Sequence, residues 1–204
     1  MDAAITIDTA DAGCALEGRR APGTRPVAVV APPHPEYGGN IDNPVVGSLM
    51  DGLRKAGRDA SCFNWRGVGG SGGLASGDLQ QAAGDYAAVV AHARRTMDAG
   101  RDGAIATGYS FGAAAAIAAT VAGARISRLL LVAPPAAMIG TLELERVSQP
   151  VHIVVGDADV YAPLAAMRSL VERLPAGALS VLPGVDHFFM HDGLDAVEKA
   201  AAAL

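Results

Sequence analysis

The sequence of 204 residues is poor in cysteine and aromatic residues and has no long uncharged apolar run. Its two cysteines, Cys14 and Cys62, are too few for the disulfide framework of a small secreted protein. The longest apolar stretch, Phe111 to Ala124, falls short of the roughly 20 residues that a membrane-spanning helix needs. The first residues lack the basic and apolar segments of a signal peptide. We therefore expect a cytoplasmic protein without a membrane partner.

Positive charge is also scarce, with 16 basic against 21 acidic side chains and a formal net charge of −5. Because Lys and Arg form no cluster, nucleic acid and anionic membrane surfaces are poor candidate partners. What the sequence does have is hydrophobic residues, which make up 50% of the chain. This share excludes intrinsic disorder, and the length is sufficient to bury a core. We expect a single domain over residues 1–204 that is a monomer or a homodimer.

Short β-branched segments alternate with longer alanine-rich segments along the chain. This alternation is typical of a mostly parallel sheet covered by helices. The expected strands are Ala4–Asp8, Ala15–Arg19, Val27–Ala31, Asp59–Asn64, Gly103–Thr107, Ser127–Val132, Val151–Val155 and Leu179–Pro183. The expected helices are Pro44–Ala56, Asp78–Met97, Phe111–Val121, Leu164–Arg173 and Gly193–Ala203. The predicted fold class is α/β, with an antiparallel hairpin at one edge of an eight-stranded sheet.

The sharpest motif is Gly-Tyr-Ser-Phe-Gly at residues 108–112, between an expected strand and an expected helix. G-x-S-x-G in this context is the nucleophile elbow, in which a sharp turn presents the serine above the sheet. Gly108 and Gly112 provide the small neighbours that such a turn requires. The free N–H groups at the start of the helix can stabilise an oxyanion. We predict that Ser110 is a nucleophile; the alternative is a serine that only caps the helix.

A nucleophilic serine needs a base and an orienting acid, and in this fold both follow the serine in the chain. We predict His187 as the base, because it lies on a loop directly after the last expected strand. The other histidines precede the serine, lie inside a strand or a helix, or begin the last helix: His34, His92, His152 and His191. Asp157 and Asp159 compete as the acid, and we predict Asp159 because it has more room to reach the base. Asp186 is interpreted as a turn residue.

The oxyanion hole should combine the N–H of Phe111 with one from the loop at residues 32–40. Three prolines in that loop have no N–H group. Of the remaining His34, Glu36 and Tyr37, we predict the backbone N–H of His34. The alternative is a rigid turn that holds Tyr37 against the edge of the sheet.

Residues 67–72, Gly-Val-Gly-Gly-Ser-Gly, match the G-x-G-x-x-G pattern of dinucleotide-binding sites. A true fingerprint runs directly into a helix and has an acidic residue at the end of the next strand. Neither condition is met here. We therefore expect a flexible loop beside the catalytic site, and we expect neither a cofactor nor a metal ion.

Only about 18 residues, Ala133 to Pro150, separate the two strands between which lids are usually inserted in this fold, so we expect an open site without a cap domain. Eight of the nine aromatic residues lie near the loops expected to form this site. We predict that Tyr37, Trp65, Tyr109 and Phe188 line an apolar substrate site. The alternative is that strand ends are core regions in any case.

Five motifs in order carry a family resemblance: the segments at 32–46 and 64–69, Gly-Tyr-Ser-Phe-Gly, Gly-Asp-Ala-Asp and Asp-His-Phe-Phe. Together they resemble the small lidless bacterial α/β-hydrolases related to dienelactone hydrolase-like esterases. The resemblance implies the α/β-hydrolase fold and a Ser110–Asp159–His187 triad. Members usually have His-Pro-His-Pro where this chain has Pro32-Pro33-His34-Pro35, so whatever loop anchoring the first histidine provides in the family is not expected here, whereas the triad is unaffected.

These observations together predict a serine hydrolase that cleaves a small-molecule carboxylic ester through an acyl-enzyme on Ser110. Two alternatives stay open. The same triad can serve a thioesterase, an acyltransferase or a cyclising enzyme in which another nucleophile resolves the acyl-enzyme. The chain can also be a non-catalytic binding protein on a hydrolase fold.

Overall fold

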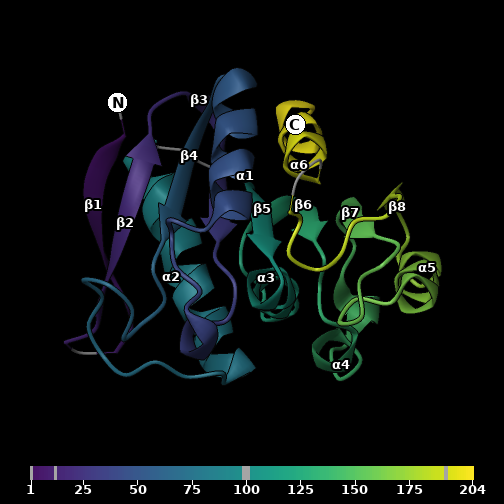
Figure 1. Cartoon of the computed structure of the whole chain (residues 1–204). Coiled ribbons are helices and arrows are strands. Elements are labelled where there is room, and N and C mark those ends of the chain that lie inside the picture. Colours follow the sequence, from purple (N-terminus) through teal and green to yellow (C-terminus); the bar gives the residue numbers. More distant parts are fainter. Residues whose placement is uncertain (1, 12, 98–101, 191–192) are drawn as a thin grey trace.

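The computed structural model describes residues 2–11, 13–97, 102–190 and 193–204. Within these ranges eight strands form one sheet in the order β1-β2-β4-β3-β5-β6-β7-β8 (Figure 1). The strands are β1 (Ala3–Asp8), β2 (Ala15–Ala21), β3 (Thr24–Ala31), β4 (Arg58–Phe63), β5 (Ala104–Tyr109), β6 (Ile126–Val132), β7 (Val151–Gly156) and β8 (Gly177–Leu182). β1 and β2 pair antiparallel, as do β2 and β4, and all other pairs are parallel. The predicted fold class and edge hairpin are confirmed.

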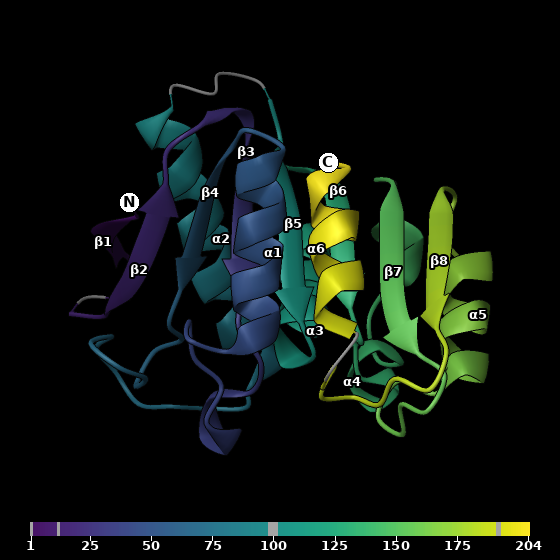
Figure 2. The ribbon, with the colours of Figure 1, turned by 45° about the horizontal axis from the view of Figure 1, so that its top comes forward.

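Helices cover both faces of this sheet (Figures 1 and 2). α1 (Pro44–Lys55) and α6 (Gly193–Ala202) lie side by side on one face, and α2 (Leu79–Thr96) and α3 (Phe111–Val121) lie on the other. α5 (Leu164–Glu172) packs against β7 and β8. Gly52 permits the close contact of α1 with α6, because a Cβ atom there would lie 2.3 Å from the carbonyl oxygen of Glu198. Short turns complete the fold: η1 (Pro35–Tyr37), α4 (Ala136–Ile139) and η2 (Leu144–Arg146).

The centre of the sheet is apolar on both faces, as expected for parallel strands between two helical layers. β5 is buried along its whole length, and α3 is buried up to its last residue, Val121, which is half-buried. The Tyr86 hydroxyl, from α2, donates to the backbone oxygens of Val29 in β3 and Thr107 in β5, each at 2.9 Å. Tyr86 is the one aromatic residue that the sequence places away from the loops of the expected site. It is a core residue whose buried hydroxyl is hydrogen-bonded to the sheet backbone.

Because β3 to β8 run in one direction, the loops that follow β3, β4, β5, β7 and β8 emerge together at the carboxyl edge of the sheet, the lower edge in Figure 2. Between β6 and β7 the chain forms only α4 and η2, so no cap domain covers this edge. The site predicted at this edge is therefore open.

In the described ranges, no helix combines the length and apolar character needed to cross a membrane.

Candidate active site

Ser110 occupies a strained turn between β5 and α3. Its backbone angles, φ 54° and ψ −118°, are unusual for a residue other than glycine. A Cβ atom on Gly108 would lie 2.5 Å from the backbone of Gly112, and one on Gly112 would lie 2.5 Å from the carbonyl oxygen of Ala31. Side chains at either glycine would thus collide with backbone. The turn has the geometry expected of a nucleophile elbow.

The structure brings Ser110, His187 and Asp159 into one hydrogen-bonded chain. The Ser110 Oγ lies 2.9 Å from the His187 Nε2, and the His187 Nδ1 lies 2.7 Å from the Asp159 Oδ2. His187 and Asp159 are 8% and 4% exposed, so solvent competes little for their hydrogen bond. The second carboxylate oxygen, Asp159 Oδ1, accepts from the backbone N–H groups of Tyr161 and Ala162, each at 2.8 Å. These two bonds fix the rotation of the carboxylate.

The two other aspartates considered as the acid serve their own turns. The exposed carboxylate of Asp157 accepts a hydrogen bond of 2.7 Å from the N–H of Gly184. Asp186 accepts one of 3.0 Å from the N–H of Phe188, as expected of a turn residue. Of the three, Asp159 is the one hydrogen-bonded to His187.

Tyr109 holds the His187 loop in place. Its hydroxyl donates a hydrogen bond of 2.7 Å to the backbone oxygen of His187. Burial, with smaller contributions from the charges of Asp159 and Asp186, raises the pKa of this phenol, so it stays protonated as a donor. At 4% exposure the ring offers little surface to a ligand. The buried ring does not fit the predicted contact with substrate. Its hydrogen bond fits a residue that positions His187.

Trp65 is also buried, at 2% exposure, beneath the loop after β3. Its indole N–H points to the carbonyl oxygens of Pro32 and Pro33, at 3.0 and 3.1 Å. Its ring packs edge-on against Phe111, with centroids 5.4 Å apart. Trp65 therefore anchors the loop after β3, and its burial does not fit the predicted contact with substrate.

The two N–H groups predicted for the oxyanion hole lie on adjoining segments. The ring of His34 contacts that of Phe111, with centroids 4.7 Å apart, which brings the loop after β3 to the start of α3. Within the described residues neither the N–H of His34 nor that of Phe111 donates a hydrogen bond to the protein. Both N–H groups are thus left for a ligand oxygen.

Three exposed aromatic rings lie beside His187 or His34. Tyr37 and Phe188, both predicted to bind substrate, are 87% and 62% exposed. Tyr161, at 56%, was not among the predicted binding residues, although it follows Asp159 by only two positions. The ring centroids of Tyr161 and Phe188 lie 4.8 and 5.9 Å from that of His187. The ring centroid of Tyr37 lies 4.6 Å from that of His34.

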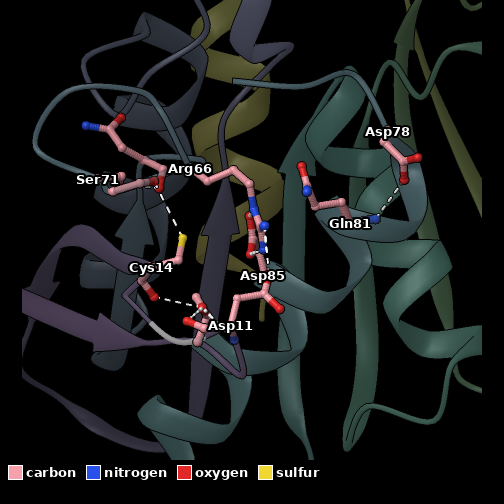
Figure 3. Close-up of polar contacts among 10 residues, drawn as sticks. Asp11, Cys14, Arg66, Ser71, Asp78, Gln81 and Asp85 are labelled. Atoms are coloured by element: carbon pink, nitrogen blue, oxygen red, sulfur yellow. Dashed lines mark hydrogen bonds and ion pairs between the residues drawn. The ribbon is translucent and has the colours of Figure 1, made fainter. Parts of the chain in front are cut away.

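The glycine-rich loop at residues 64–78 is fixed by polar contacts rather than flexible, which corrects our expectation. The Arg66 guanidinium binds both carboxylate oxygens of Asp85 on α2 and reaches Asp11 at the turn between β1 and β2 (Figure 3). The Ser71 hydroxyl accepts from the N–H of Glu17 and donates to the oxygen of Asn64.

The structure around this loop differs from that of a dinucleotide site. α2 begins only at Leu79, where Asp78 caps it by accepting from the N–H of Gln81 (Figure 3). The loop therefore does not run from its glycines straight into a helix N-terminus, as the fingerprint requires. Across the described part of the chain, no three His, Cys, Asp or Glu side chains gather as a metal site.

Comparisons with known proteins agree with this architecture. No family model matches the sequence. A structure of an α/β serine hydrolase homologue from Coxiella burnetii is 25% identical, with a TM-score of 0.85 over 98% of this chain and 96% of that chain. XC6422 from Xanthomonas campestris, a serine hydrolase without a lid, is 29% identical, with a TM-score of 0.82 over 99% of this chain and 92% of its own. The uncharacterized protein RP471 of Rickettsia prowazekii (strain Madrid E) is 29% identical over an alignment of 188 residues, and the match covers 86% of this chain and 78% of that protein.

The chain is thus a small α/β-hydrolase-fold protein without a lid, as the motifs predicted. These similarities support a hydrolase on this fold. The narrower resemblance to dienelactone hydrolase-like esterases stays a prediction.

A second serine–histidine pair lies away from this site, between β7 and β8. The His152 Nε2 lies 2.8 Å from the Ser180 Oγ. No carboxylate in the described residues binds His152, so this pair lacks the third member of a triad. Burial lowers the pKa of His152. It also lowers the pKa of His34 and is the largest cause of the lowered pKa of His92.

A histidine whose pKa is depressed by folding binds fewer protons in the native state than in the unfolded chain. Its contribution to stability is therefore fully present above the unfolded pKa of about 6.5 and is lost as the pH falls below that value. We expect His152→Gln to lose less stability than the wild type between about pH 7.5 and pH 5.5. Urea midpoints at both pH values measure the difference, and parallel losses in the two proteins would contradict it.

Proposed function

We propose that the chain is a serine hydrolase that cleaves carboxylic esters through an acyl-enzyme on Ser110. The observation that carries this proposal is the hydrogen-bonded chain from Ser110 through His187 to Asp159 at an open edge of the sheet. The strained turn under Ser110 and the similarity to serine hydrolases support it independently. A positive φ at a residue other than glycine, as at Ser110, is a backbone strain that clusters at functional sites.

The proposed reaction begins with the hydrogen bond between His187 and Asp159. Because the carboxylate accepts from Nδ1–H, the lone pair of the imidazole is on Nε2 and faces the Ser110 hydroxyl. His187 takes the hydroxyl proton as the Ser110 oxygen attacks the ester carbonyl carbon. It then gives that proton to the departing alcohol, which leaves an acyl group on Ser110. Water, deprotonated by His187, releases the acid and restores the serine.

Backbone groups stabilise the tetrahedral intermediate in this proposal. The N–H groups of Phe111 and His34 donate to the oxyanion, and the positive end of the α3 dipole adds to their effect. Tyr37, Tyr161 and Phe188 supply apolar surface for the substrate. Tyr109 and Trp65 position the His187 loop and the His34 loop without touching the substrate.

Covalent labelling with a fluorophosphonate tests this function directly. The reagent phosphonylates a serine that an adjacent base activates, with loss of fluoride, so we expect one label on the peptide that contains Ser110. Ser180→Ala is the matched control, because Ser180 also bonds a histidine but lacks the acid and the elbow. Labelling should persist in Ser180→Ala and vanish in Ser110→Ala. Equal labelling of Ser110→Ala and the wild type would overturn the proposal.

A further inference from the structure

The loops at the carboxyl edge of the sheet carry a strongly uneven charge. In the described part of these loops, residues 32–43, 64–78, 133–150, 157–163 and 183–190, eight side chains are acidic and two are basic. The acidic residues are Glu36, Asp42, Asp78, Glu143, Glu145, Asp157, Asp159 and Asp186, and the basic residues are Arg66 and Arg146. The whole chain is far closer to balance, with 21 acidic and 16 basic residues. Negative charge is thus concentrated at the edge that holds Ser110.

Both basic residues of these loops are already paired with carboxylates. Arg66 binds Asp85 and Asp11, and Arg146 lies 2.9 Å from a carboxylate oxygen of Glu143. Burial lowers the pKa of His34, which keeps that ring neutral near pH 7. In the described part of these loops, each arginine is therefore already paired with a carboxylate and is poorly placed to bind an anionic substrate.

Two exposed carboxylates lie on the two loops that reach the candidate nucleophile, one from His34 and one from His187. Glu36 lies in the turn that begins at His34, whose ring contacts Phe111 next to the nucleophile. Asp186 directly precedes His187 in the chain, and its charge acts on Tyr109 beneath that loop. Neither makes an ion pair within the described residues. Their charge extends into the solvent from which a substrate approaches.

The same loops hold every large hydrophobic side chain that is exposed in the described chain. These residues are Tyr37, Leu74, Val160, Tyr161, Phe188 and Met190. Burial of apolar surface favours binding of the apolar part of a substrate, whatever charge the rest of that substrate carries. The edge therefore combines attraction for apolar groups with an electrostatic field that repels anions.

We propose that this site selects apolar esters that are uncharged or positively charged, and discriminates against esters and thioesters that bear carboxylate or phosphate groups. Selection arises because Glu36 and Asp186 repel a negative group as it nears Ser110, while the exposed rings bind the apolar part of any substrate. Acyl thioesters of coenzyme A, which carry several phosphate charges, belong to the rejected class. This inference rests on the proposed function.

Three p-nitrophenyl esters of matched length test the proposal: a neutral alkanoate, a hemiester ending in a carboxylate, and an ester ending in a trimethylammonium group. Each kcat/KM is divided by the rate constant for hydroxide hydrolysis of the same ester, which removes differences in intrinsic reactivity. We expect the normalised value for the anionic ester to be at least about fivefold below the neutral one at low ionic strength. The gap should shrink in about 0.5 M NaCl, where charges are screened within a few ångströms.

Variants assign the effect to the two carboxylates. Glu36→Gln and Asp186→Asn keep the shape of each side chain and remove its charge, so each should raise the anionic-to-neutral ratio, and the double variant should raise it most. Glu172→Gln is the matched control, because Glu172 is exposed at the far end of α5, at the opposite edge of the sheet. It should leave the ratio unchanged.

Different results overturn different conclusions. Equal normalised values for the anionic and neutral esters, or a ratio that the two variants do not move, would overturn the charge selection and leave the hydrolase intact. Failure to hydrolyse any of the three esters would overturn the proposed ester hydrolysis and the selection with it.

Discussion

Ser110→Ala is expected to lower kcat/KM for a short p-nitrophenyl ester by about 10⁴-fold or more. The loss is large because His187 and Asp159 act on the serine oxygen, and without it they have no nucleophile to activate. Initial rates at several ester concentrations, compared with the uncatalysed rate, measure the change.

The variant should fold like the wild type. The turn depends on the backbone bond from the Ser110 N–H to the oxygen of Val132, at 2.9 Å, and on the two glycines, none of which the substitution removes. Thermal unfolding followed by circular dichroism checks this point. Ser180→Ala, which removes the hydroxyl beside His152, should keep full activity. A Ser110→Ala protein with most of the wild-type rate would mean that the elbow has only a structural role.

The parts of the fold that the sequence predicts well are those with strong local patterns. α3 has the predicted bounds, Phe111–Val121, because the glycine-flanked turn sets its start and Gly123, with φ 92°, turns the chain out of the helix just after its end. β3 begins at Thr24 rather than Val27, because the strand continues through polar residues once a neighbour pairs with it. The short α4 and η2 have no periodicity long enough to reveal them.

Side-chain direction at the strand ends was harder to predict. Trp65 lies two residues after the end of β4, and Tyr109 is the last residue of β5, next to Ser110. Whether such a ring faces solvent or the interior depends on partners that are distant in the chain, here Pro32 for Trp65 and His187 for Tyr109. The conformation of the glycine-rich loop also depends on distant partners, because the residues that bind it, Glu17 and Asp85, lie outside the loop in the chain. None of these contacts can be predicted from the residues that neighbour Trp65, Tyr109 or the loop in the sequence.

The choice between Asp159 and Asp157 rests on which loop position can turn toward the base, and here the structure permits a sharp test. Asp159→Asn should lower kcat by about 10³- to 10⁴-fold, whereas Asp157→Asn should change it by less than about threefold. The reason lies in the hydrogen bonds of each carboxylate. The N–H groups of Tyr161 and Ala162 both point at one oxygen of Asp159 and will keep an oxygen there. In Asp159→Asn, the new amide nitrogen must then face His187.

That amide nitrogen is a donor, so the His187 Nδ1 becomes an acceptor and the imidazole proton moves to Nε2. An imidazole protonated on Nε2 cannot take the proton of Ser110, and the variant fails through the wrong tautomer while its fold is kept. The amide oxygen of Asp157→Asn, by contrast, can still accept from the N–H of Gly184, so this variant serves as the matched control. Turnover of the neutral p-nitrophenyl ester, with thermal unfolding of both variants, decides between them. A large loss for Asp157→Asn together with a small one for Asp159→Asn would transfer the acid role to Asp157.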